Sequence, residues 1–124
     1  LKNRVIFVGK TNEEDKILCS SDLFLLPSEK ESFGLAALEA MALKVPVVSS
    51  NTGGLPELNI HGNSGYTSDI GDIESMASNA IKILSDKSLK KKYRSQAFEN
   101  AKKYDIKKII PLYEEIYNEA LNNN

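Results

Sequence analysis

Short apolar runs alternate with stretches of helically spaced apolar residues along the first half of the chain. Three of these runs predict buried strands, because each is brief, rich in valine, isoleucine or leucine, and bounded by glycine, proline or serine. They span residues 5–9, 23–27 and 46–50. Gly62 and Gly65 predict a turn that leads into a further short strand at Tyr66.

The segments between the strands predict helices. The first is capped by Thr11 or Asn12, carries acidic residues in its first turn and ends near Ser20. The second spans residues 33–43, where five of the eleven residues are alanine or glycine, which permits close packing on a sheet. A single helical turn is expected near Pro56.

The last third of the chain predicts helices alone. Asp72 caps a helix that ends near Leu84, and its apolar residues recur at helical spacing. They are Ile73, Met76, Ala77, Ala80, Ile81 and Leu84. Two more helices are expected over residues 88–104 and 106–121, with Pro111 kinking the second.

Strands that alternate with helices, followed by helices alone, are typical of a Rossmann-like parallel α/β sheet with flanking helices. Ligands of such sheets bind beside the carboxyl ends of the strands. Those ends fall at residues 9–10, 27–35 and 50–54. We therefore expect these three segments to lie together and to form the binding site.

Composition narrows the class without identifying the function. The chain has 124 residues, 41% of them hydrophobic and 27% charged, which fits one soluble domain with a modest core. A net charge of −1 does not favour nucleic acid as a partner. The single cysteine, Cys19, excludes an internal disulfide framework and fits a reducing, cytoplasmic compartment. No apolar run reaches the roughly 20 residues of a membrane span.

The strongest chemical pattern is a pair of glutamates, Glu31 and Glu39, on either side of the tripeptide Phe33-Gly34-Leu35. A strand gives way to a helix here, and the first N–H groups of a helix have no partner within it. Those donors and the helix dipole attract anions, and a glycine lets a ligand approach the backbone. An anion site flanked by two carboxylates suits a nucleotide-sugar, which carries a diphosphate between two polyols.

Segments 27–35, 39–42, 45–48 and 53–57 together resemble the donor-binding half of a retaining glycosyltransferase of group 1, family 4, with the two-domain GT-B fold. The resemblance covers nearly the whole chain. It implies that residues 1–121 are part of the C-terminal nucleotide-sugar-binding domain, followed by a polar tail at 122–124. It also implies a partner region upstream, with the acceptor domain and the basic residues that grip the diphosphate. The fragment alone is then expected to be inactive.

A narrower match within the family rests on residues 28–35 and 61–66. It implies transfer of N-acetylglucosamine from UDP to a small hydroxyl acceptor, L-malate, in bacillithiol biosynthesis. The UDP-sugar is then a substrate, and no cofactor or metal is implied. The alternatives are an enzyme of polysaccharide or lipid-linked glycan synthesis, a UDP-sugar 2-epimerase, and an inactive sugar-nucleotide-binding module. The segment 27–39 argues against the epimerase.

The resemblance places Glu31 beside the donor sugar as the catalytic carboxylate and Glu39 on two ribose hydroxyls. Without it, Glu31 is a favourable acid near a helix N-terminus and Glu39 a surface residue. A helical rise over eight residues separates the two glutamates by about 12 Å. The carboxyl pair of a retaining glycosidase lies ~5–5.5 Å apart, so the glutamates fit two ends of one ligand better.

The remaining expected donor-binding residues act chiefly through their backbone or by flanking the base. They are Lys10, Ser32, Phe33, Gly34, Leu35, Gly53 and Gly54. Each has an alternative interpretation, as an exposed lysine, a core phenylalanine or a plain glycine turn. We expect Glu57 to order its loop or begin a helix rather than to act as a catalytic base. His61 is a lone histidine on a predicted surface turn, which is only weak evidence for a catalytic role. The basic run 87–108 predicts a solvated helix face, with membrane association as the alternative.

Overall fold

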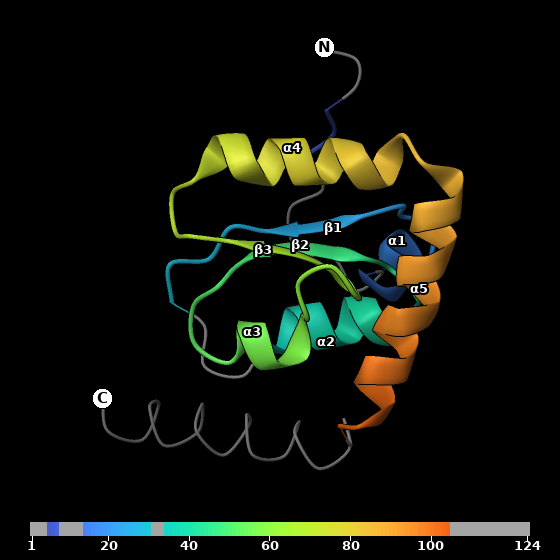
Figure 1. The fold of residues 1–124 in the computed structure, drawn as a ribbon. Helices are drawn as coiled ribbons and strands as arrows, with labels where there is room; N and C mark the ends of the chain where they lie inside the picture. Colours follow the sequence, from blue (N-terminus) through green and yellow to red (C-terminus); the bar gives the residue numbers. More distant parts are fainter. Residues whose placement is uncertain (1–4, 8–13, 31–33, 105–124) are drawn as a thin grey trace.

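The computed structural model describes residues 5–7, 14–30 and 34–104 (Figure 1). Three parallel strands form one sheet in the order β1-β2-β3. The strands are β1 (Phe24–Leu26), β2 (Val47–Ser50) and β3 (Gly65–Ser68). The helices are α1 (Glu14–Cys19), α2 (Leu35–Ala42), α3 (Leu55–Leu58), α4 (Ile73–Leu84) and α5 (Lys87–Lys102). The predicted Rossmann-like α/β class is confirmed.

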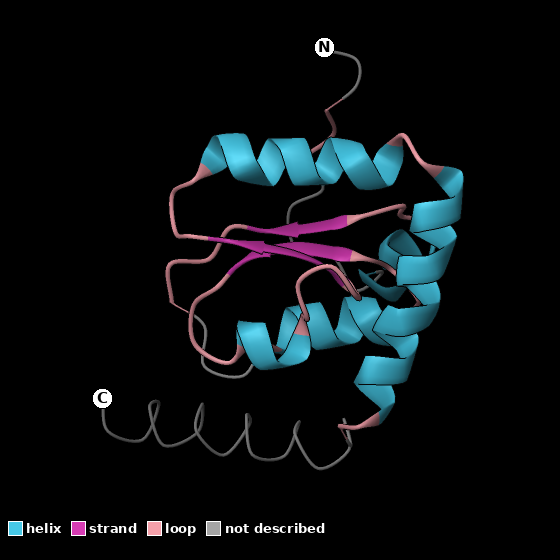
Figure 2. Cartoon of the chain, viewed as in Figure 1, coloured by secondary structure: helices cyan, strands magenta, loops and turns pink. Residues whose placement is uncertain are grey.

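The elements form three layers. Helices α2 and α3 cover one face of the sheet, and α4 covers the other (Figure 1). Helix α5 crosses the end of the sheet at which the strands begin, and it packs on both α4 and α2 (Figure 2). The connections that leave the carboxyl ends of the strands therefore lie together on the opposite side from α5.

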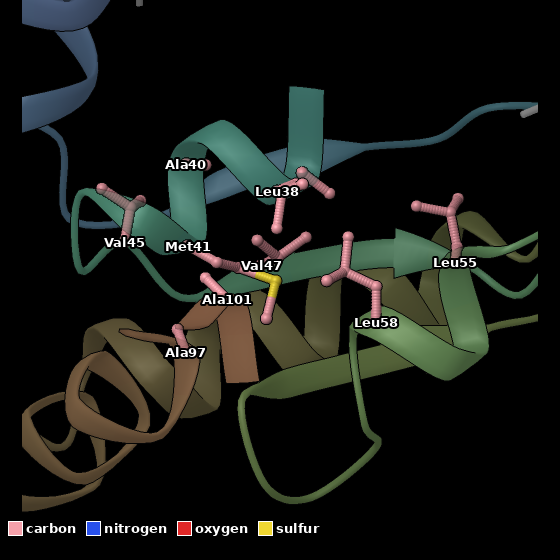
Figure 3. Packing of buried hydrophobic residues seen from close by; sticks show 10 residues of the cluster. Leu38, Ala40, Met41, Val45, Val47, Leu55, Leu58, Ala97 and Ala101 are labelled. Carbon is pink, nitrogen blue, oxygen red and sulfur yellow. The ribbon is translucent and has the colours of Figure 1, made fainter. Parts of the chain in front are cut away.

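The larger part of the core lies between the sheet, α2 and α3 (Figure 3). Ala37 and Ala40 are fully buried, so α2 approaches the sheet as closely as its small residues predicted. Larger side chains from three elements and one turn fill the rest of this layer, together with two alanines of α5: Leu38, Met41, Val45, Val47, Leu55 and Leu58, with Ala97 and Ala101. On the other face, Val48 packs with Met76, Ile83 and Tyr93.

A buried polar cluster joins the starts of β2 and β3. The Asn59 Nδ2 atom donates at 3.1 Å to the carbonyl oxygens of Val47 and Tyr66 and to Ser49 Oγ. Its Oδ1 accepts from Ser64 Oγ at 3.0 Å. Each of these polar groups has lost its water, so the shared hydrogen bonds offset a desolvation cost of roughly 1–3 kcal/mol per group.

One predicted strand is wrong over the part that the structure describes. Val5, Ile6 and Phe7 are 57%, 82% and 94% exposed and lie outside any strand. A β-branched run needs a neighbouring backbone to satisfy its hydrogen bonds, and residues 5–7 pair with none of the described strands. The rest of that predicted strand, residues 8–9, lies outside the described residues.

The predicted apolar face of α4 is wrong for four of its six residues. Of the six residues expected on it, Met76 is buried and Ala80 half-buried, whereas four are exposed: Ile73, Ala77, Ile81 and Leu84. Asn79 and Ile83 are buried instead.

Hydrogen bonds to the end of β3 set the rotation of α4. Ser68 Oγ lies 2.8 Å from Ser75 Oγ, and Asn79 Nδ2 donates to Ser68 Oγ at 3.4 Å. The spacing of apolar residues in the sequence cannot indicate this polar contact. The predicted cap is confirmed, because Asp72 Oδ1 accepts from the Ser75 N–H at 3.1 Å.

Other boundaries agree with the predictions to within a few residues. Helix α5 begins one residue earlier than predicted, because Asp86 Oδ1 accepts from the Leu89 N–H at 3.0 Å and caps it. The expected cap of α1 at Thr11 or Asn12, and the helix over 106–121 with its kink at Pro111, lie outside the described residues.

Gly65 is expected to be indispensable for folding. A Cβ atom at this position would lie 1.7 Å from the Val47 carbonyl oxygen, which belongs to the central strand and cannot move away. Gly65→Ala should lower the free energy of unfolding by about 3 kcal/mol or more in urea denaturation. Gly62→Ala is the control, since a Cβ there meets nothing within 4 Å although its φ is 75°. Equal losses in the two variants would contradict the close approach.

The orientation of α4 can be tested with two isoleucines of the same helix. Ile83 is fully buried and Ile81 is 64% exposed. Ile83→Ala should cost about 2–5 kcal/mol in thermal or urea unfolding. Ile81→Ala should change stability by no more than about 0.5 kcal/mol. The reverse order would restore the face predicted from the sequence.

Candidate functional site

The structure describes five of the nine expected site residues. Gly34, Leu35, Glu39, Gly53 and Gly54 are described. The other four lie outside the described residues: Lys10, Glu31, Ser32 and Phe33. The described residues all lie in the two connections that follow β1 and β2, or in the helices that these connections begin.

Gly34 sets the start of α2. It is buried and adopts a left-handed conformation with φ 66° and ψ 35°, which glycine accepts without strain. No side chain among the described residues caps this helix end, and its first turn carries no acidic residue. Within the described residues, the first N–H groups of α2 therefore have no capping side chain and keep their capacity to donate.

Helix α3 lies directly beneath this turn. A Cβ atom on Gly34 would lie 3.1 Å from Leu55 Cδ2 and 3.4 Å from Leu58 Cδ2. Because Leu55 follows Gly54 directly, the glycine pair and the start of α2 are neighbours. Gly53 has φ 55° and needs glycine, whereas Gly54 has an ordinary φ of −81°.

Glu39 lies in the second turn of α2 and is half-buried. The neighbouring residues Leu38, Ala40 and Met41 are all buried against the sheet and α3. Five residues separate Gly34 from Glu39, an axial rise of roughly 7–8 Å. The carboxylate and the N–H groups at the helix start can thus contact separate parts of one extended ligand.

The segment that follows β2 connects all three loops at this edge. Ser50 Oγ donates to the Ser28 carbonyl at 2.5 Å, and Thr52 Oγ1 donates to the Glu29 carbonyl at 3.2 Å. Asn51 Nδ2 donates to Asp69 Oδ1 at 2.7 Å on the other side. Sequence reasoning missed these contacts, although three polar residues in succession at a strand end were a visible signal.

His61 packs along β3. It forms a bridge with Gly65, the first residue of β3, and its Nδ1 atom accepts from the Thr67 N–H at 3.0 Å. The centroids of its ring and of the Tyr66 ring lie 5.2 Å apart in an edge-on arrangement. These contacts involve none of the nine expected site residues.

Tyr66 in turn packs on Tyr93 of α5, with their rings 5.5 Å apart. The Tyr93 hydroxyl donates to that of Tyr66 at 3.2 Å. Burial, assisted by the Tyr66 hydroxyl, raises the pKa of Tyr93 to about 12. The Tyr93 ring therefore acts as a neutral packing group at physiological pH.

The basic residues of α5 fit the predicted solvated helix face. Lys90 Nζ lies 3.0 Å from Asp22 Oδ1, and Lys102 Nζ lies 3.3 Å from Glu99 Oε1 and 4.7 Å from the Phe98 ring centroid.

Among the helices in the described ranges, none combines the length and the hydropathy that a transmembrane span requires. Over the same ranges, no three His, Cys, Asp or Glu residues are placed to hold a metal ion.

Known proteins are similar to this chain in sequence. Residues 1–104 match the family model described as glycosyl transferases group 1. The chain is 41% identical over its whole length to N-acetyl-alpha-D-glucosaminyl L-malate synthase of Bacillus anthracis, of which it covers 33%. It is 32% identical over 81% of its length to the sulfoquinovosyl transferase SQD2 of Arabidopsis thaliana, of which it covers 21%.

Solved structures agree with the fold. HepE of Anabaena, solved in complex with UDP, superposes on 96% of the chain with a TM-score of 0.81 and 28% identity. Sucrose-phosphate synthase of Thermosynechococcus elongatus covers 98% of the chain with a TM-score of 0.79 and 26% identity. The chain spans 33% and 31% of these two structures. The chain thus covers between about a fifth and a third of the length of these four proteins. It belongs to the glycosyl transferases group 1 family.

Proposed function

We propose that the chain is the donor-binding part of a retaining family 4 glycosyltransferase that uses a UDP-sugar. The observation that carries this proposal is the left-handed Gly34 at the start of α2, a helix end that no described side chain caps, beside the Gly53-Gly54 turn. In a chain of the group 1 family, this arrangement offers N–H donors for a diphosphate at the carboxyl edge of a parallel sheet.

Each site residue then has a role along the donor. The Glu39 carboxylate accepts hydrogen bonds from two ribose hydroxyls, for which it has two acceptor oxygens. The backbone N–H groups of Phe33, Gly34 and Leu35 bind the distal phosphate and sugar hydroxyls, and Ser32 lies beside them. Glu31 contacts the donor sugar. Lys10 flanks the base, and Gly53 and Gly54 leave room for the ligand.

The proposed reaction retains the configuration of the sugar without a protein nucleophile. The acceptor hydroxyl attacks the anomeric carbon from the face on which UDP departs. The bond from that carbon to the diphosphate oxygen breaks as the new glycosidic bond forms. A leaving phosphate oxygen takes the acceptor's proton. The protein contributes position and charge stabilisation.

For the substrates, we propose N-acetylglucosamine as the donor sugar and L-malate as the acceptor, as in bacillithiol biosynthesis. Two relatives support the sugar: the malate synthase and the 2-deoxystreptamine N-acetyl-D-glucosaminyltransferase of Niallia circulans, 39% identical over 60% of the chain. Only the first supports malate. A different acceptor, in polysaccharide or lipid-linked glycan synthesis, is the second candidate, favoured by the capsular polysaccharide glycosyltransferase CapM of Staphylococcus aureus.

The proposal includes a cytoplasmic enzyme in which an upstream domain completes the site. Turnover assays with UDP-N-acetylglucosamine and a panel of acceptors, on the full-length protein and on this chain alone, test it. Transfer to malate by the full-length protein, but not by this chain alone, supports the proposal. Transfer to the hydroxyl of another acceptor favours the second candidate. Absence of any transfer by the full-length protein refutes the proposal that it is a glycosyltransferase.

Glu39→Gln should weaken the binding of UDP itself. The substitution keeps the size of the side chain but removes its charge, and a charge-assisted hydrogen bond typically contributes about 1.5–3 kcal/mol. Isothermal titration of the full-length protein should show the Kd for UDP rising about tenfold or more. Glu74→Gln, an exposed glutamate in the first turn of α4, is the matched control. Unchanged UDP affinity in Glu39→Gln would reject the assignment.

Glu31→Gln should lower turnover and leave the binding of UDP nearly unchanged. If this carboxylate contacts the sugar, its loss removes interactions made in the transition state, so kcat falls while the Kd for UDP stays close to that of the wild type. Steady-state kinetics and titration of the same preparation give both values. A parallel fall in UDP affinity would show that the two glutamates do not have separate roles.

A further inference from the structure

Two hydroxyls after the central strand bind the connection that leads to the proposed sugar contact. Ser50 Oγ donates to the Ser28 carbonyl and Thr52 Oγ1 to the Glu29 carbonyl. The residues that they join are 22 and 23 positions apart in the sequence. These bonds are tertiary, and they link the ends of neighbouring strands.

The hydrogen bonds of the segment after β2 divide between two neighbours. Ser50 and Thr52 both bond the connection that follows β1, whereas Asn51 bonds Asp69 in the connection that follows β3. Ser50 is 1% exposed, so its hydroxyl is placed by the packing around β2.

The described residues at the two ends of this connection are both held by hydrogen bonds. On one side, Ser28 and Glu29 are bound by the two hydroxyls. On the other, Gly34 begins α2, and its carbonyl accepts from the Leu38 N–H at 2.9 Å. Glu31 follows Glu29 by two residues, so its Cα cannot lie more than about 7 Å from that anchored Cα.

We propose that Ser50 and Thr52 are positioning residues for the donor sugar. Their hydroxyls fix the backbone of Ser28 and Glu29, and this limits where Glu31 and the first N–H groups of α2 can meet the sugar and distal phosphate. The inference rests on the proposed function. Both hydroxyls donate to the backbone that leads to the proposed sugar contact, so they should affect the reacting sugar far more than the binding of UDP.

The test uses the full-length protein with Ser50→Ala and Thr52→Val, each of which removes one hydroxyl. Thr52→Ser keeps the hydroxyl and should restore activity. Ser85→Ala is the control, since it removes a hydroxyl bond of 2.6 Å to the Ile81 carbonyl at the far end of α4. We expect kcat/KM for UDP-N-acetylglucosamine to fall between about tenfold and a hundredfold in the first two variants, as small misplacements of reacting groups do. The Kd for UDP should stay near the wild-type value.

A double-mutant cycle separates positioning from general stability. In the Glu31→Gln background, Thr52→Val should lower turnover much less than in the wild type, because the group that it positions is already disabled. Equal losses in both backgrounds would overturn the proposal. If Ser50→Ala does not fold, Thr52→Val alone decides, since Thr52 is only half-buried.

Trypsin gives a readout that does not depend on the donor. Lys30 is exposed and follows the anchored residues directly. Loss of either hydroxyl should accelerate cleavage after Lys30, while cleavage after Lys91 of α5 stays unchanged. If the wild type neither binds UDP nor transfers sugar, the proposed function fails and the positioning role with it. If the wild type is active and Thr52→Val cleaves faster yet keeps its kcat/KM, the positioning role alone fails.

Discussion

Burial of β2 on both faces is the constraint on which the rest of the domain depends. All four of its residues are buried, with Val47 in the layer of α2 and α3 and Val48 in the layer of α4. β2 is hydrogen-bonded to β1 on one side and to β3 on the other. A slip of one residue would move the Ser49 hydroxyl to the other face, away from Asn59 Nδ2, so the buried polar contact fixes the register.

That fixed strand also determines where a ligand can bind. Since all three strands are parallel, their carboxyl ends lie at one edge, and α5 covers the other. Ser50 is at once the last residue of β2 and the donor to the Ser28 carbonyl. The core and the candidate site therefore share a residue, and the precision of the site derives from the packing of the strand.

The sequence predicted the parts of the fold that depend on local patterns. The small residues of α2, the cap at Asp72 and the brief apolar run of β2 each express a local preference, and each was found. The strand predicted at residues 5–7 was wrong because strand pairing depends on a distant backbone. The prediction of the apolar face of α4 was wrong for four residues because Asn79 turns inward to Ser68, which apolar spacing cannot indicate.

The candidate site shows the same division. Gly34 was recognisable because a glycine at a strand-to-helix junction has a local reason to be there, and its φ of 66° agrees. The hydroxyls of Ser50 and Thr52 were missed because their acceptors are backbone carbonyls more than twenty positions away. Any residue type supplies such a carbonyl, so nothing in the acceptor's sequence marks it.

The central claim is that a uridine nucleotide binds at the carboxyl edge of this sheet. Amide hydrogen exchange of the full-length protein, measured with and without UDP, tests it most directly. The account predicts that UDP slows exchange in peptides that cover residues 34–39 and 50–54, and leaves residues 61–65 and 87–102 unchanged. Protection confined to those last two segments, at the edge where the strands begin, would contradict it.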